Sequence, residues 1–336
     1  MEFRIVMREQ EMRSQAVHSM QPVGDASVSK YDRLVNRAQE LVRVKTVVAY
    51  PCDEPSLRGP MEAAELGIIE PILVGPPEKI AALSRECQID ISCTKVVDAA
   101  TPEAAAKKAV EMIRQSEGEM LMKGSLHTDE LMREVTASTT GLRTSRRISH
   151  VFVMDVPSYS DILLVTDAAI NIFPDLDVKR DIVQNAIDLF TQSGLGTPRV
   201  AILSAVETVT SKIPSTIDAA ALCKMADRGQ ITGGVLDGPL AFDNAIDPVA
   251  AKIKGISSPV AGQAQILVVP DLEAGNMLAK NLVYLSKADA AGIVLGARVP
   301  IVLTSRSDSV RARMASCAVG VIYADARRRK QALPEV

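Results

Sequence analysis

Short apolar runs alternate with longer stretches of helical periodicity along most of the chain. Each run is bounded by Pro, Gly or polar residues, which predicts a buried strand, and the stretches between runs repeat apolar side chains every three or four positions, which predicts helices. In the first part of the chain the predicted strands are residues 46–50, 71–74, 95–97 and 120–122, and the predicted helices are residues 31–44, 55–66, 79–87 and 102–116. This alternation indicates β–α units with a largely parallel sheet, so the predicted fold class is α/β.

The second part of the chain continues the same alternation. Its predicted strands are residues 151–154, 161–166, 199–204 and 266–269, and its predicted helices are residues 175–190, 215–228 and 276–285. Residues 238–245 contain Gly, Pro, Asp and Asn, and we predict a loop there. Residues 1–29 are rich in Met, Gln and Ser and carry no clear fold signal, so we interpret them as an N-terminal extension.

One stretch near the C-terminus combines a strand, a polar turn and a helix. Residues 301–303 are apolar and β-branched, the turn holds Ser305, Arg306 and Asp308, and helical periodicity follows. Ligands of open α/β sheets bind beyond the carboxyl ends of strands, and arginine offers a planar donor fork for phosphate. The turn is therefore a candidate oxyanion site. As an alternative, Ser305 and Asp308 form a capping box and Arg306 is a solvated loop residue.

Three further groups of residues could bind anions. Lys123, Gly124, Ser125, His127 and Thr128 lie at another predicted strand-to-helix turn, where Ser125 or Thr128 would cap the helix. Asn276 and Lys280 share one helix face, and a lysine near a helix start suits a bound anion, although a surface lysine is the simpler interpretation. Arg143, Arg146 and Arg147 form a short basic run that is either a solvated linker or an anion site.

Composition narrows the class of protein. With 336 residues, 47% of them hydrophobic, the chain suits two domains with large cores. A net charge of −3 and 3% aromatic residues disfavour nucleic-acid binding. The five cysteines and three histidines show no metal-ligand spacing, so we expect no metal. The chain has neither an apolar run for a membrane helix nor a signal-peptide core, and we expect a soluble, cytoplasmic protein.

Taken together, several segments resemble the phosphate acetyl/butyryltransferase family. The most specific are SPVAGQAQILVVPDLEAGNMLAKNL and GARVPIVLTSRSDS. MKGSLHT, DAAINIFPDLDVKRDIVQNAI, VAILSAVE and VLDGPLAFDNAI resemble further segments of that family in the same order. The resemblance extends over about residues 30–327, nearly the whole chain.

The resemblance implies a two-domain α/β fold, with mostly parallel sheets flanked by helices, similar to that of the isocitrate and isopropylmalate dehydrogenases. Domain I would combine residues 30–145 with 297–336, domain II would span residues 146–296, and the active-site cleft would lie between them. The family is usually homodimeric. It converts acyl-CoA and inorganic phosphate into acyl phosphate and CoA, so CoA is a substrate or product and no cofactor is needed.

The resemblance also implies roles for individual residues. Ser305 would bond the thiolate sulfur, and Arg306 would hold phosphate or the developing oxyanion. Gly124, Ser125 and Thr128, with Asn276 and Lys280, would line the phosphate side of the cleft. Acetyl-type members carry an aspartate seven residues after the serine, where this chain has Ala312. Asp308 could replace it as the base for the CoA thiol, or could merely cap the helix.

We expect the acetyl group to be the acyl chain. Propionyl and butyryl are alternatives, because the TSR-x-D-S form of the turn is closer to the butyryl-type branch of the family. Two other classes of protein remain as alternatives. One is a dehydrogenase of related fold, although no dinucleotide-binding Gly motif is present. The other is a catalytically silent protein that binds acyl-CoA or phosphate.

Overall fold

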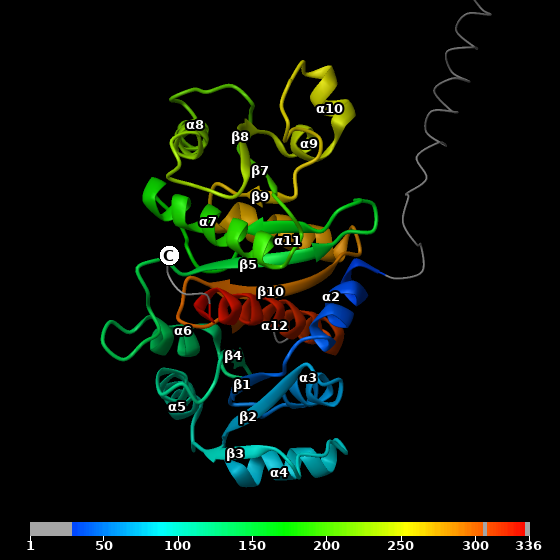
Figure 1. Cartoon of the computed structure of the whole chain (residues 1–336), viewed down its shortest axis with the longest axis vertical. Coiled ribbons are helices and arrows are strands. Elements are labelled where there is room, and N and C mark those ends of the chain that lie inside the picture. The colour runs from blue at the N-terminus through cyan, green and yellow to red at the C-terminus, as the bar shows by residue number, and fades with distance from the viewer. Residues whose placement is uncertain (1–28, 305–307, 333–336) are drawn as a thin grey trace, which may run out of the picture.

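The computed structural model describes residues 29–304 and 308–332, and Figure 1 shows their arrangement. The strands are β1 (Val44–Ala49), β2 (Ile69–Gly75), β3 (Lys95–Asp98), β4 (Met120–Lys123), β5 (Ser149–Asp155), β6 (Leu163–Thr166), β7 (Arg199–Leu203), β8 (Val235–Leu240), β9 (Ile266–Val268), β10 (Asp289–Leu295) and β11 (Ile301–Val302). The helices are α2 (Lys30–Gln39), α3 (Glu54–Glu65), α4 (Pro77–Glu86), α5 (Pro102–Arg114), α6 (Thr128–Thr136), α7 (Leu176–Gln192), α8 (Pro214–Asp227), α9 (Phe242–Ile246), α10 (Pro248–Ile253), α11 (Leu272–Tyr284) and α12 (Val310–Ala332). Apart from Ser29, which caps α2, the predicted N-terminal extension lies outside the described residues.

All of these strands join one sheet in the order β3-β2-β1-β4-β11-β10-β5-β6-β9-β7-β8. The pairings are parallel except β11–β10, β10–β5 and β5–β6 at the centre. The sheet therefore has two parallel wings of opposite strand direction, joined by antiparallel central strands. β11 comes from the C-terminal part of the chain, yet it pairs in parallel with β4 of the first wing. The mostly parallel α/β sheet is as predicted, whereas the division into two domains stays a prediction.

Alternating side chains build different cores on the two faces of the sheet. On β11, Val302 enters the core shared by α2, α3, α4, α7, α8 and α12, whereas Ile301 enters a core with α5 and α6. On β9, Val268 faces the shared core, and Leu267 enters a third core with α9 and α11. The face opposite α12 thus carries two separate cores, one over each wing.

Several predicted elements were wrong. Residues 238–245, predicted as a loop, contain the end of β8 and most of α9, because Val235 to Leu240 pairs with β7 despite its Gly and Pro. β10 begins with Asp289 followed by the small residues Ala290, Ala291 and Gly292, and it gave no strand signal in the sequence analysis. α11 begins at Leu272, where Asp271 accepts a hydrogen bond from Ala274 N, so Lys280 is not near a helix start. The macrodipole argument for an anion at Lys280 therefore does not hold.

The predicted helix caps also differ from the observed ones. Ser309 Oγ accepts a hydrogen bond from Ala312 N at 3.1 Å, so Ser309 occupies the N-cap of α12. Ser305 lies outside the described residues, so its capping box with Asp308 stays a prediction. In α6 the N-cap is His127, not Ser125 or Thr128, and Glu130 accepts a hydrogen bond from His127 N at 2.6 Å.

Candidate active site

The carboxyl ends of β1, β4 and β11 meet at one edge of the first wing. β4 lies between the other two strands, pairing Val48 with Met122 and Met122 with Val302, all in parallel. Gly124 and Thr304, nearly 200 residues apart in the sequence, therefore leave neighbouring strands at the same level. Ligands of α/β proteins bind beyond such strand ends.

A dense set of hydrogen bonds shapes the turn after β4. Tyr50 O accepts from Ser125 N, Ser125 Oγ and Cys52 N, each at 2.9 Å. Gly124 N donates to Ala49 O at 2.9 Å, and a Cβ at Gly124 would lie only 2.5 Å from Tyr50 O. Gly124 is therefore required by close backbone approach. Tyr50 itself has φ 56°, a left-handed conformation that is uncommon outside glycine and that these bonds maintain.

Two buried cations lie beside this turn: Lys123, which the sequence placed in a candidate anion-binding turn, and Arg313, to which the sequence analysis gave no role. Lys123 is 3% exposed, and its Nζ donates to Gly124 O and Leu126 O. Arg313 on α12 is 2% exposed, and its Nη1 donates to Thr304 Oγ1 at 2.8 Å. Desolvation lowers the pKa of Arg313, although the negative charge of Asp308 opposes that effect. Arg313 could have been found as a charged residue at a core-facing position of a helix.

The predicted catalytic turn is described only in part. Ser305 and Arg306 lie outside the described residues, between Thr304 at the end of β11 and Asp308, which is half-buried. Ala312, at the position of the family's aspartate, lies in the first turn of α12.

A cavity of about 890 Å³ opens between the wings. Thr128, exposed at the start of α6, lines one side, and Ala169, Ile170 and Asn171 line the other. Asp167 builds that second side, because its carboxylate accepts hydrogen bonds from the backbone N–H groups of all three residues. The cavity thus lies between α6 of the first wing and the start of α7 in the second wing.

Asn276 and Lys280 belong to the second wing. Asn276 Nδ2 donates to Ala168 O at 3.3 Å, so it lies beside the turn that borders the cavity. Lys280 is exposed one helical turn further along α11. Gly124, Ser125 and Thr128 are therefore brought together at one strand end, whereas Asn276 and Lys280 approach from the opposite wing.

His150 is a buried group that the sequence analysis left unassigned. It is 1% exposed on β5, and burial lowers its pKa to about 3. Its ring packs edge-to-face on Phe152, with 4.4 Å between centroids. His150 is therefore neutral near pH 7 and a poor general base.

The described residues contain neither a cluster of metal-ligating side chains nor a membrane-spanning helix. No group of three or more His, Cys, Asp or Glu side chains there could hold a metal ion. None of the helices in this part of the chain is long and apolar enough to cross a membrane.

Known proteins match over most of the chain. The family model described as "Phosphate acetyl/butaryl transferase" matches residues 101–321. A phosphate acetyltransferase of Rhizobium meliloti is 70% identical over 91% of this chain and 97% of its own length. A phosphate butyryltransferase of Clostridium beijerinckii is 40% identical over 88% of this chain and 97% of its own length.

A solved structure agrees with these sequence matches. The branched-chain phosphotransacylase of Enterococcus faecalis V583 is 29% identical and superposes with a TM-score of 0.73, over 84% of this chain and 99% of its own. The segments that suggested the resemblance are therefore supported by matches along the chain. The chain belongs to the phosphate acetyl/butyryltransferase family.

Proposed function

We propose that this chain is a phosphate acyltransferase that interconverts acetyl-CoA and inorganic phosphate with acetyl phosphate and CoA. The 70% identity to a phosphate acetyltransferase over nearly the full length of both chains is the observation that carries this proposal. Propionyl and butyryl groups are further candidate acyl chains, because a butyryltransferase is 40% identical. The strand ends that hold Gly124 and Thr304 supply the place for the reaction.

In the proposed reaction an oxygen of phosphate attacks the thioester carbonyl carbon. The carbonyl π electrons move to oxygen to give a tetrahedral oxyanion, which collapses as the C–S bond breaks. The electron pair of that bond leaves on the CoA sulfur as a thiolate, and acyl phosphate remains. Negative charge accumulates next to an anionic nucleophile, so preorganised donors are the main catalytic requirement.

Buried cations fit this requirement. The charges of Lys123 and Arg313 lie at the ends of adjacent strands, where low exposure strengthens their effect on a nearby anion. Both hold the surrounding chain, through Gly124 O, Leu126 O and Thr304 Oγ1. We assign these two cations to positioning and electrostatic roles.

The remaining roles follow the family's pattern. Gly124, Ser125 and Thr128 would border the phosphate, with the N-terminal N–H groups of α6 as further donors. Arg306 would bind phosphate and the oxyanion, and Ser305 would donate to the thiolate sulfur. In the reverse direction Asp308 would accept the CoA thiol proton, since Ala312 cannot. Asn276 and Lys280 would approach the phosphate from the second wing.

Other properties belong to the same proposal. CoA is a substrate or product, and no cofactor or metal takes part. The two wings correspond to the predicted domains I and II, in the manner of the isocitrate and isopropylmalate dehydrogenases. The assembly is a homodimer in the cytoplasm that binds neither nucleic acid nor membranes.

A thiol-release assay tests the activity. Purified protein is given acetyl-, propionyl- or butyryl-CoA with and without phosphate, in the presence of a chelator. We expect phosphate-dependent CoA release that is fastest with acetyl-CoA. Arg306→Ala should lower kcat/KM by about 10²–10³-fold, the scale of a lost oxyanion donor.

Arg85→Ala serves as the matched control, because Arg85 is exposed on α4, and it should behave as wild type. CoA binding without any phosphate-dependent release would instead support the catalytically silent protein that Ala312 suggests. Metal-dependent NAD reduction would support the dehydrogenase alternative.

A further inference from the structure

A basic cavity lies at the edge of the first wing that is opposite to the proposed reaction centre. This distal cavity has a volume of about 250 Å³ and is lined by the segments before β4 and β11, the end of α5 and the C-terminal half of α12. A second cavity of about 480 Å³ shares Arg114 and Arg298 with it, so the two adjoin. Because β4 and β11 are parallel, both start at this edge, and their carboxyl ends lead to Gly124 and Thr304. The proposed reaction uses neither cavity.

Three arginines of the distal cavity have no carboxylate partner among the residues that the structure describes. Arg114 ends α5, Arg298 precedes β11 and Arg327 lies on α12. Arg327 Nη1 donates to Ala297 O at 3.3 Å. Arg114 and Arg298 are exposed, and neither side chain makes a hydrogen bond within this part of the chain. Like charges that converge on a small volume repel one another, so an anion between them would be stabilised.

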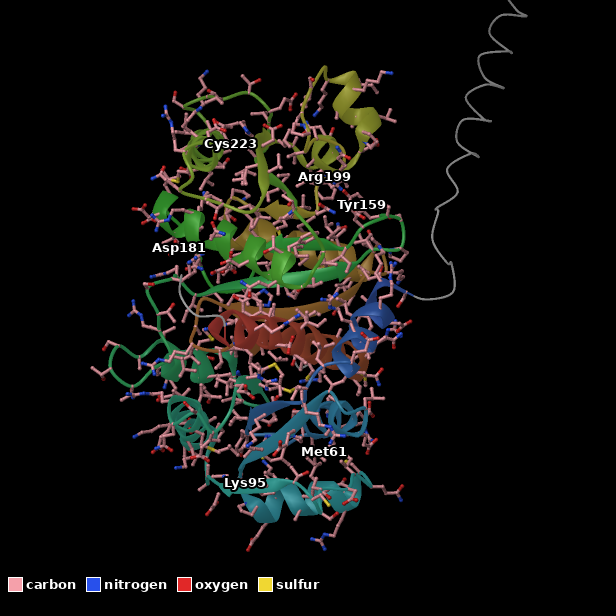
Figure 2. The ribbon with its side chains drawn as sticks, viewed as in Figure 1. Met61, Lys95, Tyr159, Asp181, Arg199 and Cys223 are labelled. Carbon is pink, nitrogen blue, oxygen red and sulfur yellow. The ribbon has the colours of Figure 1, made fainter. Side chains whose placement is uncertain are left out.

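Both glutamates of the turn before β4 are paired with other cations. Arg328 binds the Glu119 carboxylate through Nε at 2.5 Å and also through Nη2. Figure 2 labels Lys95 at the start of β3, and its Nζ lies 3.1 Å from Glu117 Oε2. These two carboxylates therefore leave the three arginines of the distal cavity without neutralisation.

The adjoining cavity is mixed in charge. Besides the two shared arginines it is lined by Lys107, Glu111 and Glu134, and Glu111 is bound by Lys108 at 3.1 Å. A ligand that occupies both cavities should therefore place its anionic groups in the distal cavity and its uncharged polar groups in the adjoining one.

Backbone hydrogen bonds fix the wall that carries Arg298. Arg298 N donates to Leu142 O at 2.9 Å, and Pro300 O accepts from Leu121 N at 3.1 Å. These bonds join the segment before β11 to β4 and to the chain that follows α6. A site whose backbone is already ordered has a smaller entropic cost of binding.

The distal cavity contacts the chain on both sides of the proposed catalytic turn. Pro300 lines the cavity and precedes Thr304 by four residues, and a rise of roughly 3.3 Å per residue gives about 13 Å between them. Arg327 lines the cavity from α12, the helix that follows the turn. A ligand that holds both segments can therefore alter affinity or rate at the reaction centre, as an effector does.

We propose that the distal cavity binds a small dianion, either a phosphate monoester or a dicarboxylate, through Arg114, Arg298 and Arg327, and that this dianion is an effector of the enzyme. The planar fork of arginine suits both phosphate and carboxylate oxygens. A volume of about 250 Å³ lies below that of drug-sized ligand sites, which favours a ligand of few atoms. The binding is independent of the proposed function, whereas the effect on turnover rests on it.

Calorimetric titration with two probes tests the binding. Glycerol 3-phosphate and succinate are each titrated, in phosphate-free buffer, into wild type and into the Arg114→Ala/Arg298→Ala double variant. We expect at least one probe to bind wild type, and the double variant to bind it at least tenfold more weakly, as for lost charge-assisted hydrogen bonds. Tighter binding of glycerol 3-phosphate assigns the site to phosphate monoesters, and tighter binding of succinate assigns it to dicarboxylates.

Two control variants locate the bound probe. Arg143 lines the cavity between the wings, so Arg143→Ala should bind the probe as wild type does. Arg85→Ala removes an exposed arginine of α4 and should also behave as wild type. Absence of binding to wild type, or a loss of binding in Arg143→Ala but not in the double variant, would overturn the proposal. If the double variant does not fold, the two single variants carry the same comparison, because each removes one exposed guanidinium.

Kinetics test the effector role. With phosphate in excess of its KM, the bound probe should change kcat or the KM for acetyl-CoA at least twofold in wild type and leave both unchanged in the double variant. Unchanged kinetics in wild type with the probe bound would overturn the effector role. A protein without turnover that still binds the probe through these arginines would retain the site and reject the proposed function.

Discussion

Replacing Thr304 by valine tests whether the end of β11 is held by the buried arginine. Thr304 is 2% exposed, and its Oγ1 accepts a 2.8 Å hydrogen bond from Arg313 Nη1, which is equally buried. Valine keeps the β-branched shape and the strand propensity, so the substitution removes one acceptor and little volume. Arg313 makes other interactions, which the substitution leaves in place, so Thr304→Val removes only this one hydrogen bond.

The expected cost follows from the burial of both groups. A hydrogen bond to a charged partner contributes about 1.5–3 kcal/mol, and no water replaces the lost acceptor at this depth. We therefore expect Thr304→Val to lower the free energy of unfolding by about 2 kcal/mol, measured by urea denaturation. The proposed turnover should also fall, because residues 305–308 follow directly from this anchor.

Thr304→Ser is the matched control for this prediction. It keeps the hydroxyl and loses one methyl group, so it should retain most of the stability and most of the activity. If valine and serine variants were equally stable, the Arg313 bond would not be what holds the end of β11.

Two further predictions concern packing and proton binding. Gly124→Ala places a Cβ 2.5 Å from Tyr50 O, so the turn must shift. We expect denaturation to show a free energy of unfolding about 1–3 kcal/mol lower, together with reduced activity. Wild-type stability and activity would refute the steric argument. His150 has a pKa of about 3 in the folded state and about 6.5 in the unfolded state. Between these pH values the unfolded state binds more protons, so the free energy of unfolding falls as the pH drops from about 6.5 towards 3. The slope is at most about 1.4 kcal/mol per pH unit. His150→Gln should reduce that slope in pH-dependent denaturation while the exposed His127→Gln retains it, and equal slopes in both variants would contradict a buried neutral imidazole.

Much of the fold could be predicted from the sequence because its strands are continuous apolar runs. Such runs are typical of strands that are buried on both faces, and β1, β2, β7 and β9 were all located within a few residues. β10 and β8 were not predicted from the sequence, and the reason is physical. Their Ala, Gly and Pro residues have weak strand propensity, and only pairing with neighbouring strands makes them strands.

The site was predictable only where its residues lie close in sequence. Gly124, Ser125 and Thr128 belong to one turn, so a local pattern could mark them. The proximity of Lys123 to Thr304 depends on the parallel pairing of β4 with β11, which no local pattern shows. Arg313 reaches Thr304 from α12, the helix that follows β11. The helix starts at His127 and Ser309 were missed because several neighbouring residues could equally serve as caps.

The end of β11 depends on a small residue of the neighbouring central strand. On the face with two separate cores, Gly292 of β10 lies beside His150, and a Cβ there would be 2.5 Å from Leu303 O. β5 brings the His150 ring to the same place, so Gly292 is the small residue that leaves room for that ring and for Leu303 O. A larger residue at Gly292 would displace the end of β11, which leads directly to residues 305–308. The position of the proposed catalytic turn therefore depends on the size of the residue at Gly292, which the antiparallel pairing of β10 with β11 places beside Leu303.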